Sequence, residues 1–203
     1  MTNSRLEKVL FFCKVQRIVF LKKKRSDSML SIVDTSVFLW LSLCYLAMLL
    51  GGVLMAIQST EWREWYAHLK KAPWSPPNWI FGIVWPILYS LRGVASWLAF
   101  RAVADAPSYG AWVVCWAFAL VTLFLNASWT PIFFGLRMIR LALLILVLTF
   151  AAAIVHAGTC WSINIISGAL LIPELLWLAF AFSLNLYVVM SNDVVTTETF
   201  ERL

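Results

Sequence analysis

Charged residues are scarce in this chain. They make up 13% of its 203 residues, whereas 62% are hydrophobic and the mean hydropathy is +0.84. A soluble domain contains about 25% charged and about 45–50% apolar residues, so this chain has too few charges to cover a water-facing globule of its size. The composition predicts an integral membrane protein. The formal net charge of +6 then indicates cations that flank membrane segments, and nucleic acid is not expected as a partner.

Cysteine and histidine are also few, which argues against a disulfide framework and against a metal site. The four cysteines show no paired spacing, and three of them lie in or beside apolar runs. We interpret them as small buried hydrophobes. The two histidines, His68 and His156, form no cluster of ligands, and we interpret them as interface residues at helix ends. The cysteines are Cys13, Cys44, Cys115 and Cys160.

The motifs of common enzymes are absent. The sequence contains no Gly-rich phosphate loop, no nucleophile elbow and no HExxH zinc motif, and no two carboxylates share an apolar segment. Phosphoryl transfer, acyl transfer and metal-dependent proteolysis need such groups at fixed spacings. An ordinary hydrolase or transferase is therefore not expected.

Long apolar runs dominate the chain instead. A helix needs about 20 apolar residues to cross a bilayer core, and five runs reach that length. The expected fold class is an all-α integral membrane protein, a five-transmembrane-helix bundle over residues 37–192, followed by a C-terminal tail at 193–203. The runs span residues 37–57, 79–100, 112–134, 138–157 and 163–190.

Residues 1–28 differ from the rest of the chain. Apolar residues alternate there with Lys and Arg, and the segment closes with four cations at 22–25. Such a basic amphipathic extension can lie on an anionic bilayer or act as a targeting segment. It can also remain untranslated, because Met29 offers a second start just before the first membrane run.

Residues 62–97 hold eight Trp and Tyr rings, and three prolines interrupt the middle of this stretch. Pro77 has a fixed φ and no backbone N–H, so it suits the start of a helix. The stretch is predicted to be a stiff aromatic loop that leads into the helix at 79–100. Trp and Tyr favour positions where one end of the ring lies in apolar surroundings and the other contacts water. A membrane interface and the mouth of an apolar pocket are such positions.

Aromatic and amide side chains recur at helical spacing in three of the predicted helices. Residues that are four apart share one face of a helix, so the three stripes can line one pocket that suits a large, flat, apolar ligand with a few polar edges. Plain helix packing is the alternative explanation of such stripes. The stripes are Trp85 and Tyr89; Asn126, Trp129 and Phe133; and Trp177, Ala181 and Asn185.

Two further patterns concern charge and small residues. Arg92 and Glu174 are the only charges deep within the apolar runs, at similar depth on two helices, and we predict that they pair. The alternative is that the Arg92 side chain extends to the membrane interface and that Glu174 is protonated. A small-xxx-small stripe of Ala111, Cys115 and Ala119 permits close helix approach, and we predict a homodimer through this face.

Four motifs resemble the translocator protein family, also called the tryptophan-rich sensory protein or peripheral-type benzodiazepine receptor family. They cover much of residues 37–192 in the family's order. Residues 1–28 lie outside the resemblance. The motifs are WYAHLKKAPWSPP at 65–77, FGIVWPILYS at 81–90, LNASWTPIFFG at 125–135 and LLIPELLWLAFAFSLN at 170–185.

The resemblance implies a five-helix bundle, commonly dimeric, whose pocket is closed by the loop after the first helix. It also implies porphyrin ligands such as haem and protoporphyrin IX, with no required cofactor. Trp85 and Trp177 match two tryptophans tied to porphyrin breakdown in light, and would be catalytic if the protein is an enzyme. The positions that match the family's pocket are Tyr66, Trp74, Trp85, Asn126, Trp129, Phe133, Trp177, Ala181 and Leu184.

The sequence also departs from the family's pattern. Pro73 is shifted by one position in the loop, Glu174 follows Pro173 where the family has Tyr, and Arg92 stands where it has an uncharged residue. A polar pocket wall can change the choice of ligand. Tyr187 is followed by no Lys or Arg before residue 193, so the sterol-recognition pattern of animal members is absent, which argues against a sterol ligand.

Three functions remain open from the sequence. The leading one is a membrane tetrapyrrole-binding protein that acts as a sensor or regulator of porphyrin handling and stress response. The alternatives are a light- and oxygen-dependent protoporphyrin-degrading enzyme and a small transporter of porphyrins or other apolar ligands. Transporters commonly carry internal repeats, and none is visible here. The expected location is a bacterial inner membrane.

Overall fold

The computed structural model describes the backbone of residues 36–57, 62–102 and 108–200, and the side chains of these segments up to Asn192. The chain divides into a unit Met1–Leu39 and a unit Trp40–Leu203, and every described residue after residue 39 belongs to the second unit. The predicted extension 1–28 lies outside the described residues. Of the predicted tail 193–203, the structure describes only the helical backbone that continues to Phe200.

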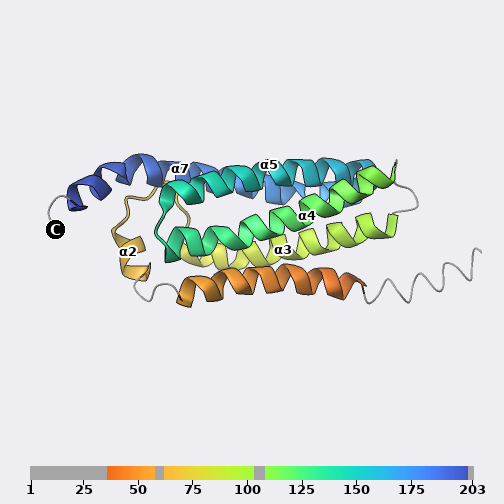
Figure 1. Ribbon diagram of the computed structural model, residues 1–203, viewed down its shortest axis with the longest axis horizontal. Helices are drawn as coiled ribbons and strands as arrows, with labels where there is room; N and C mark the ends of the chain where they lie inside the picture. The colour runs from red at the N-terminus through yellow and green to blue at the C-terminus, as the bar shows by residue number, and fades with distance from the viewer. Residues whose placement is uncertain (1–35, 58–61, 103–107, 201–203) are drawn as a thin grey trace, which may run out of the picture. The chain divides into compact units, whose positions relative to one another are not determined.

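Within the described residues, five helical segments are long and apolar enough to cross a membrane, which confirms the predicted fold class. Four of them, α3, α4, α5 and α7, run side by side in Figure 1. The segments are Ser36–Ile57; α3, Asn78–Arg101; α4, Tyr109–Thr130, prolonged by the π-helical turn η2, Pro131–Gly135; α5, Ile139–Ile163; and α6, Ile165–Ala169, followed by α7, Ile172–Phe200.

The connection after the first helix is only partly a loop. It contains the short helix α2, Trp62–His68, in which His68 Nδ1 lies 2.7 Å from the carbonyl oxygen of Glu64. Pro77 precedes the first residue of α3 with φ −54° and ψ 142°, close to the predicted helix start. The extended backbone at Pro77 turns the chain from this connection into α3.

α5 and the last membrane segment differ from the predicted runs. α5 continues six residues beyond 157 to Ile163, and it ends where Asn164 adopts extended backbone at φ −151° and ψ 118°. Thr159 is accommodated inside the helix, because its hydroxyl donates to the carbonyl of Val155 at 2.8 Å. The last segment is broken into α6 and α7. Asn164 caps α6 by accepting from Ser167 N at 3.0 Å, and Pro173 lies in the first turn of α7, where a missing N–H costs nothing.

The first helix contacts α3 and α4. The Tyr45 hydroxyl lies 2.6 Å from Ser90 Oγ on α3, and Gly51 allows the backbones to approach, since a Cβ there would lie 2.8 Å from the Ala127 carbonyl oxygen on α4. Large apolar side chains point outward, with Phe124 71% and Leu176 67% exposed, while polar side chains are buried between the helices. This distribution suits a bundle surrounded by lipid.

Candidate functional site: an aromatic cavity at one end of the bundle

A cavity of about 490 Å³ lies at the end of the bundle where α2 contacts η2. Its walls come from the first helix, the connection at 62–78, α3, α4, η2, α5 and α7. The volume falls within the range of about 300–1,000 Å³ that is usual for small-molecule sites. Figure 1 shows α2 at this end, beside the turn between α4 and α5.

The walls are mainly aromatic. Trp85 and Tyr89 project from one face of α3, with ring centroids 6.0 Å apart. Trp129 of α4 stacks on Phe133 of η2, with centroids 4.9 Å apart and an interplanar angle of 19°. These rings give the cavity broad apolar surfaces that can stack against a planar ligand.

The π-helical turn η2 contributes two adjacent phenylalanines to the cavity wall. Pro131 begins η2, and Leu136 N donates to its carbonyl at 2.8 Å, five residues back rather than four. Phe133 and Phe134 both line the cavity. Their rings receive edge contacts from α2, including Trp65 to Phe133 at 5.7 Å.

Amide side chains place polar atoms among these rings. Asn126 and Asn185 line the cavity and are 7% and 3% exposed. When its amide is oriented to suit its neighbours, the Asn185 oxygen accepts from Trp129 Nε1 at 3.2 Å. Asn185 therefore holds the indole of Trp129 in position from α7.

A buried charge pair lies next to the cavity. Arg92 Nε donates to Glu174 Oε2 at 3.0 Å, and the second guanidinium nitrogen contacts Glu174 Oε1. Asn126 Nδ2 donates to the same Oε1 at 3.5 Å, which joins the pair to the cavity wall. The predicted pair of Arg92 and Glu174 is therefore present, and it links α3, which carries Trp85, to α7.

A single cation lies at the cavity mouth among the described lining residues. Lys71 lines the cavity, and its Nζ lies 4.3 Å from the ring centroid of Tyr66. Burial raises the pKa of the Tyr66 phenol, so this hydroxyl stays protonated at neutral pH and remains a hydrogen-bond donor. Ser75 and Asn78 add further polar groups to the same rim.

The connection that carries Lys71 is fixed to α7 by a pair of hydrogen bonds. Lys70 N donates to Asn192 Oδ1 at 3.0 Å, and Asn192 Nδ2 donates back to the Lys70 carbonyl at 3.0 Å. Trp74 Nε1 donates to Ser183 Oγ at 3.4 Å, and its ring meets Tyr187 edge-on. We call residues 62–77 the lid, because they line the cavity from outside the helix bundle.

The match to known proteins covers this whole architecture. Residues 40–190 match the model of the TspO/MBR family. The chain belongs to the TspO/MBR family. It is therefore a multi-pass integral membrane protein, and its five membrane-length helices agree with that assignment.

Relatives within this family come from bacteria and mammals. The chain is 37% identical to the translocator protein of Bos taurus over 146 residues, 71% of this chain and 85% of that protein. It is 36% identical to protein CrtK of Rhodobacter capsulatus over 124 residues, 61% of this chain and 76% of that protein. It is 32% identical to the tryptophan-rich sensory protein of Cereibacter sphaeroides over 132 residues, 64% and 77% of the two chains.

Most side chains that the sequence assigned to a pocket do line this TspO/MBR cavity. Trp74 and Trp177 are the exceptions. Trp74 is 52% exposed and fixes the lid from outside. Trp177 lies behind Trp85, with ring centroids 6.5 Å apart at 89°, and faces a shallow groove on the outside of α3 and α7. The lining residues that were predicted are Tyr66, Trp85, Tyr89, Asn126, Trp129, Phe133, Ala181, Leu184 and Asn185.

Other lining residues were not predicted. The first helix contributes a wall of small and flexible side chains, which includes Gly51 and Met55, and nothing in its uniformly apolar sequence marks this face. Lys71 was counted as a flanking cation, and Asn192 was assigned no role. A polar amide at the end of an apolar run is the signal that points to Asn192, because such a group needs a partner.

The dimer face predicted from the small-residue stripe is wrong for two of its three members. Cys115 and Ala119 are each 2% exposed, and Cys115 contacts Cys160 on α5 of the same chain. Cys115 and Ala119 therefore serve close packing inside one protomer and are not accessible to a second chain. The interpretation of His156 as an interface residue is also wrong, because it is 1% exposed and lies within α5.

Proposed function

We propose that the protein binds a tetrapyrrole, haem or protoporphyrin IX, in the aromatic cavity. The observation that carries the proposal is an apolar cavity of about 490 Å³ that is lined by Trp85, by the stacked pair of Trp129 and Phe133, and by one cation, Lys71. A porphyrin has a flat apolar ring and carboxylates on one edge, so the ring would lie between Trp85 and Trp129 with its propionates near Lys71. Membership of the TspO/MBR family supports the same ligand class, because the resemblance to the translocator proteins implies porphyrin ligands.

We further propose that the protein acts as a sensor or regulator of porphyrin handling and stress response, and that ligand binding is the signal. The lid joins the first helix to α3 and is fixed to α7 through Asn192. A ligand that contacts Tyr66 and Lys71 would favour the closed lid, and the lid surface would then report occupancy to other proteins. A ligand can shift such an equilibrium only through its different affinity for the open and closed states.

A second candidate is light- and oxygen-dependent degradation of the bound porphyrin. The observation in its favour is the contact between Trp85, at the cavity wall, and Trp177 directly behind it. In this hypothesis dioxygen is the oxidant, the excited porphyrin is oxidised, and Trp85 is the residue beside the macrocycle. Trp177 would act through Trp85, because it does not line the cavity.

The membrane and the assembly state belong to the same proposal. A bacterial inner membrane is the expected location, and the relatives from Rhodobacter capsulatus and Cereibacter sphaeroides are bacterial proteins. A homodimer, expected from the family, would form through a surface other than the one containing Cys115. Cell fractionation and light scattering in detergent test these two points.

Titration of the purified protein with protoporphyrin IX, followed by tryptophan fluorescence, tests the ligand assignment. We expect saturable quenching at one porphyrin per chain, because several of the 12 tryptophans lie at or beside the cavity. Haem should compete for the same site. Linear quenching without saturation, equal to that of free tryptophan, would reject a specific site.

Illumination of the bound complex separates the binding role from the enzyme role. If the protein degrades porphyrin, Trp85→Phe should keep most of the affinity, since phenylalanine preserves a stacking surface, but should lose most of the light-dependent conversion. Absorbance of the porphyrin under light and air measures this. Equal conversion by the wild type and the variant would remove Trp85 from the mechanism.

A further inference from the structure

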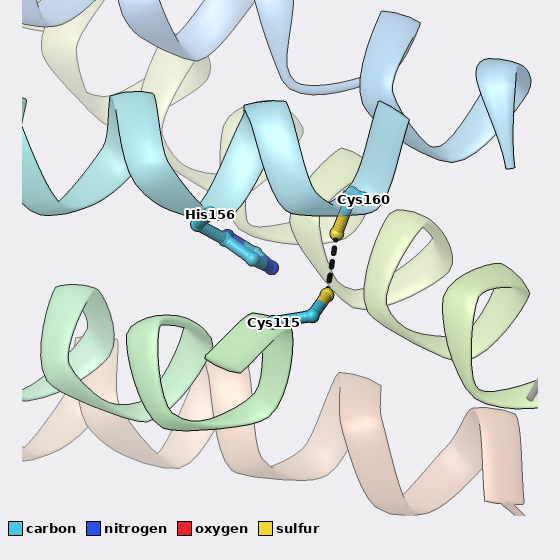
Figure 2. Close-up of side chains that lie close together, drawn as sticks. All are labelled: Cys115, His156 and Cys160. Atoms are coloured by element: carbon cyan, nitrogen blue, oxygen red, sulfur yellow. Dashed lines mark hydrogen bonds between the residues drawn. The ribbon is translucent and has the colours of Figure 1, made fainter. Parts of the chain in front are cut away.

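Three potential metal ligands meet at the end of the bundle opposite the cavity. His156 and Cys160 project from α5 toward Cys115 on α4, as Figure 2 shows. The side-chain ligand atoms of the three residues all lie within 4.8 Å of one another. The exposed fractions are 2% for Cys115, 1% for His156 and 0% for Cys160.

The helical spacing fixes two of these ligands on one surface. His156 and Cys160 are four residues apart on α5, so they share a face one turn apart, as do the two ligands of helical zinc motifs. Cys115 comes from the facing turn of α4, and its Sγ lies 2.9 Å from Cys160 Sγ in a thiol–thiol hydrogen bond. The set therefore combines a pair from one helix with a third ligand from its neighbour.

One polar atom of this cluster is unsatisfied. His156 Nε2 is buried and has no hydrogen-bond partner among the described residues. A buried polar atom without a partner is costly, and the apolar side chains packed around Cys115 and Cys160, which include Ala95, Ala99 and Ala157, offer it no hydrogen bond. An electron-pair acceptor bound by the imidazole and the two sulfurs would remove this cost.

We propose that Cys115, His156 and Cys160 bind a soft d¹⁰ cation, with Zn²⁺ as the best fit. Two thiolates and one imidazole are a known zinc ligand set that leaves a fourth position open. Two thiolates also cancel the charge of a divalent cation, so the loaded site adds no net charge to the membrane core, where an uncompensated charge is costly. Binding releases the two thiol protons to solvent.

The geometry needs only a small adjustment to accept the ion. Zinc–sulfur bonds of about 2.3 Å at a tetrahedral angle place two sulfurs about 3.8 Å apart, so the thiols must separate by roughly 1 Å from their hydrogen-bonded positions. Rotation of the cysteine side chains can supply this without moving either helix. The bound ion would then tie α4 to α5 at the end distant from the cavity.

Metal content of the protein isolated from cells tests the proposal. All cluster variants are made in a parent chain that carries Cys13→Ala and Cys44→Ala, so that Cys115 and Cys160 are its only thiols. This background chain is purified without a histidine tag. We expect about one zinc per chain, and a loss of about tenfold or more in Cys115→Ala and in Cys160→Ala. His156→Gln should lose most of its metal as well. Because Cys44 is a buried thiol outside the cluster, restoring it provides the matched control and should not change the metal content.

A second measurement needs no variant within the cluster and so does not depend on variants folding. Protein from cells grown with cobalt should show thiolate-to-cobalt charge transfer and the visible bands of a tetrahedral site. Zinc that stays at the same level in all cluster variants, or cobalt protein without thiolate bands, would overturn the proposal. So would a mass lower by two hydrogens in the freshly isolated background chain, since the two thiols would then form a disulfide by losing two protons and two electrons.

Discussion

The buried cores at the two ends of the helix bundle contain different side chains. At the cavity end, large rings such as Trp85, Trp129 and Phe133 hold the helices apart around a space of about 490 Å³. At the opposite end, Ala95, Ala99 and Cys115 and their neighbours bring α3, α4 and α5 into contact. The Arg92–Glu174 pair lies between the two regions on α3 and α7.

This difference separates the tasks of binding and of holding the bundle together. In lipid, helices associate by close packing and by hydrogen bonds rather than by the hydrophobic effect, so a bundle that opens a cavity at one end must be held tightly elsewhere. The small residues and the buried pair supply that attachment. Substitutions at the pair, at the two ends and at the cavity mouth should therefore have effects of decreasing size.

Breaking the buried charge pair should have the largest effect. Arg92→Met and Glu174→Gln should each lower the free energy of unfolding by about 3–5 kcal/mol, because each strands a buried polar partner. Glu174→Gln should cost more, since an abandoned carboxylate can take up a proton whereas a guanidinium stays charged. The double variant should recover part of the loss. Thermal unfolding in detergent measures all three, and losses that simply add would show that the pair contributes no coupling.

Adding one methyl group should distinguish a close-packed glycine at the end opposite the cavity from an open glycine on the cavity wall. A Cβ at Gly168 would lie 2.6 Å from Cα and Cβ of Trp161, whereas a Cβ at Gly82, on the cavity wall, would meet nothing within 4 Å. Gly168→Ala should therefore cost about 1–3 kcal/mol, and Gly82→Ala should be neutral or stabilise α3 by up to about 1 kcal/mol. The same unfolding assay compares them, and equal effects would mean that the packing contrast is not real.

Removing the cation at the cavity mouth should have the smallest effect and should depend on the ligand. Lys71→Met should weaken binding of free-acid protoporphyrin IX by a few-fold, because a half-exposed ion pair contributes about 0.2–1 kcal/mol. The dimethyl ester of the same porphyrin has no carboxylate, so its affinity should not change. An equal loss for acid and ester would assign Lys71 a packing role instead.

The parts of the site that follow from helical periodicity were predictable. The spacing of Trp85 with Tyr89, and of Asn126 with Trp129, decides which side chains share a face, and these residues do line the cavity. The charge pair was predictable for a similar reason, since two charges at equal depth in hydrocarbon have few other partners.

Features that depend on the packing of whole helices were not predictable. A small-residue stripe permits close approach to a helix of the same chain or of another, and spacing alone does not say which applies to Cys115. Trp177 follows the same period as Ala181 but does not line the cavity, because its ring packs behind the rings of Phe81 and Trp85 on α3. The cluster of Cys115, His156 and Cys160 exists only because α4 and α5 bring these residues together.

Blocking the cavity from its wall tests the central claim that this space is the ligand site. Ala181 lines the cavity on α7, whereas Ala179, two residues earlier, is exposed on the outer face of the same helix. Protoporphyrin IX should bind Ala181→Trp at least about tenfold more weakly, because the indole would occupy volume that the ligand needs. Ala179→Trp should bind protoporphyrin IX with the affinity of the wild type. Both variants should match the wild-type protein in gel-filtration elution and in thermal unfolding. Undiminished binding by a folded Ala181→Trp variant would contradict the assignment of the cavity as the site.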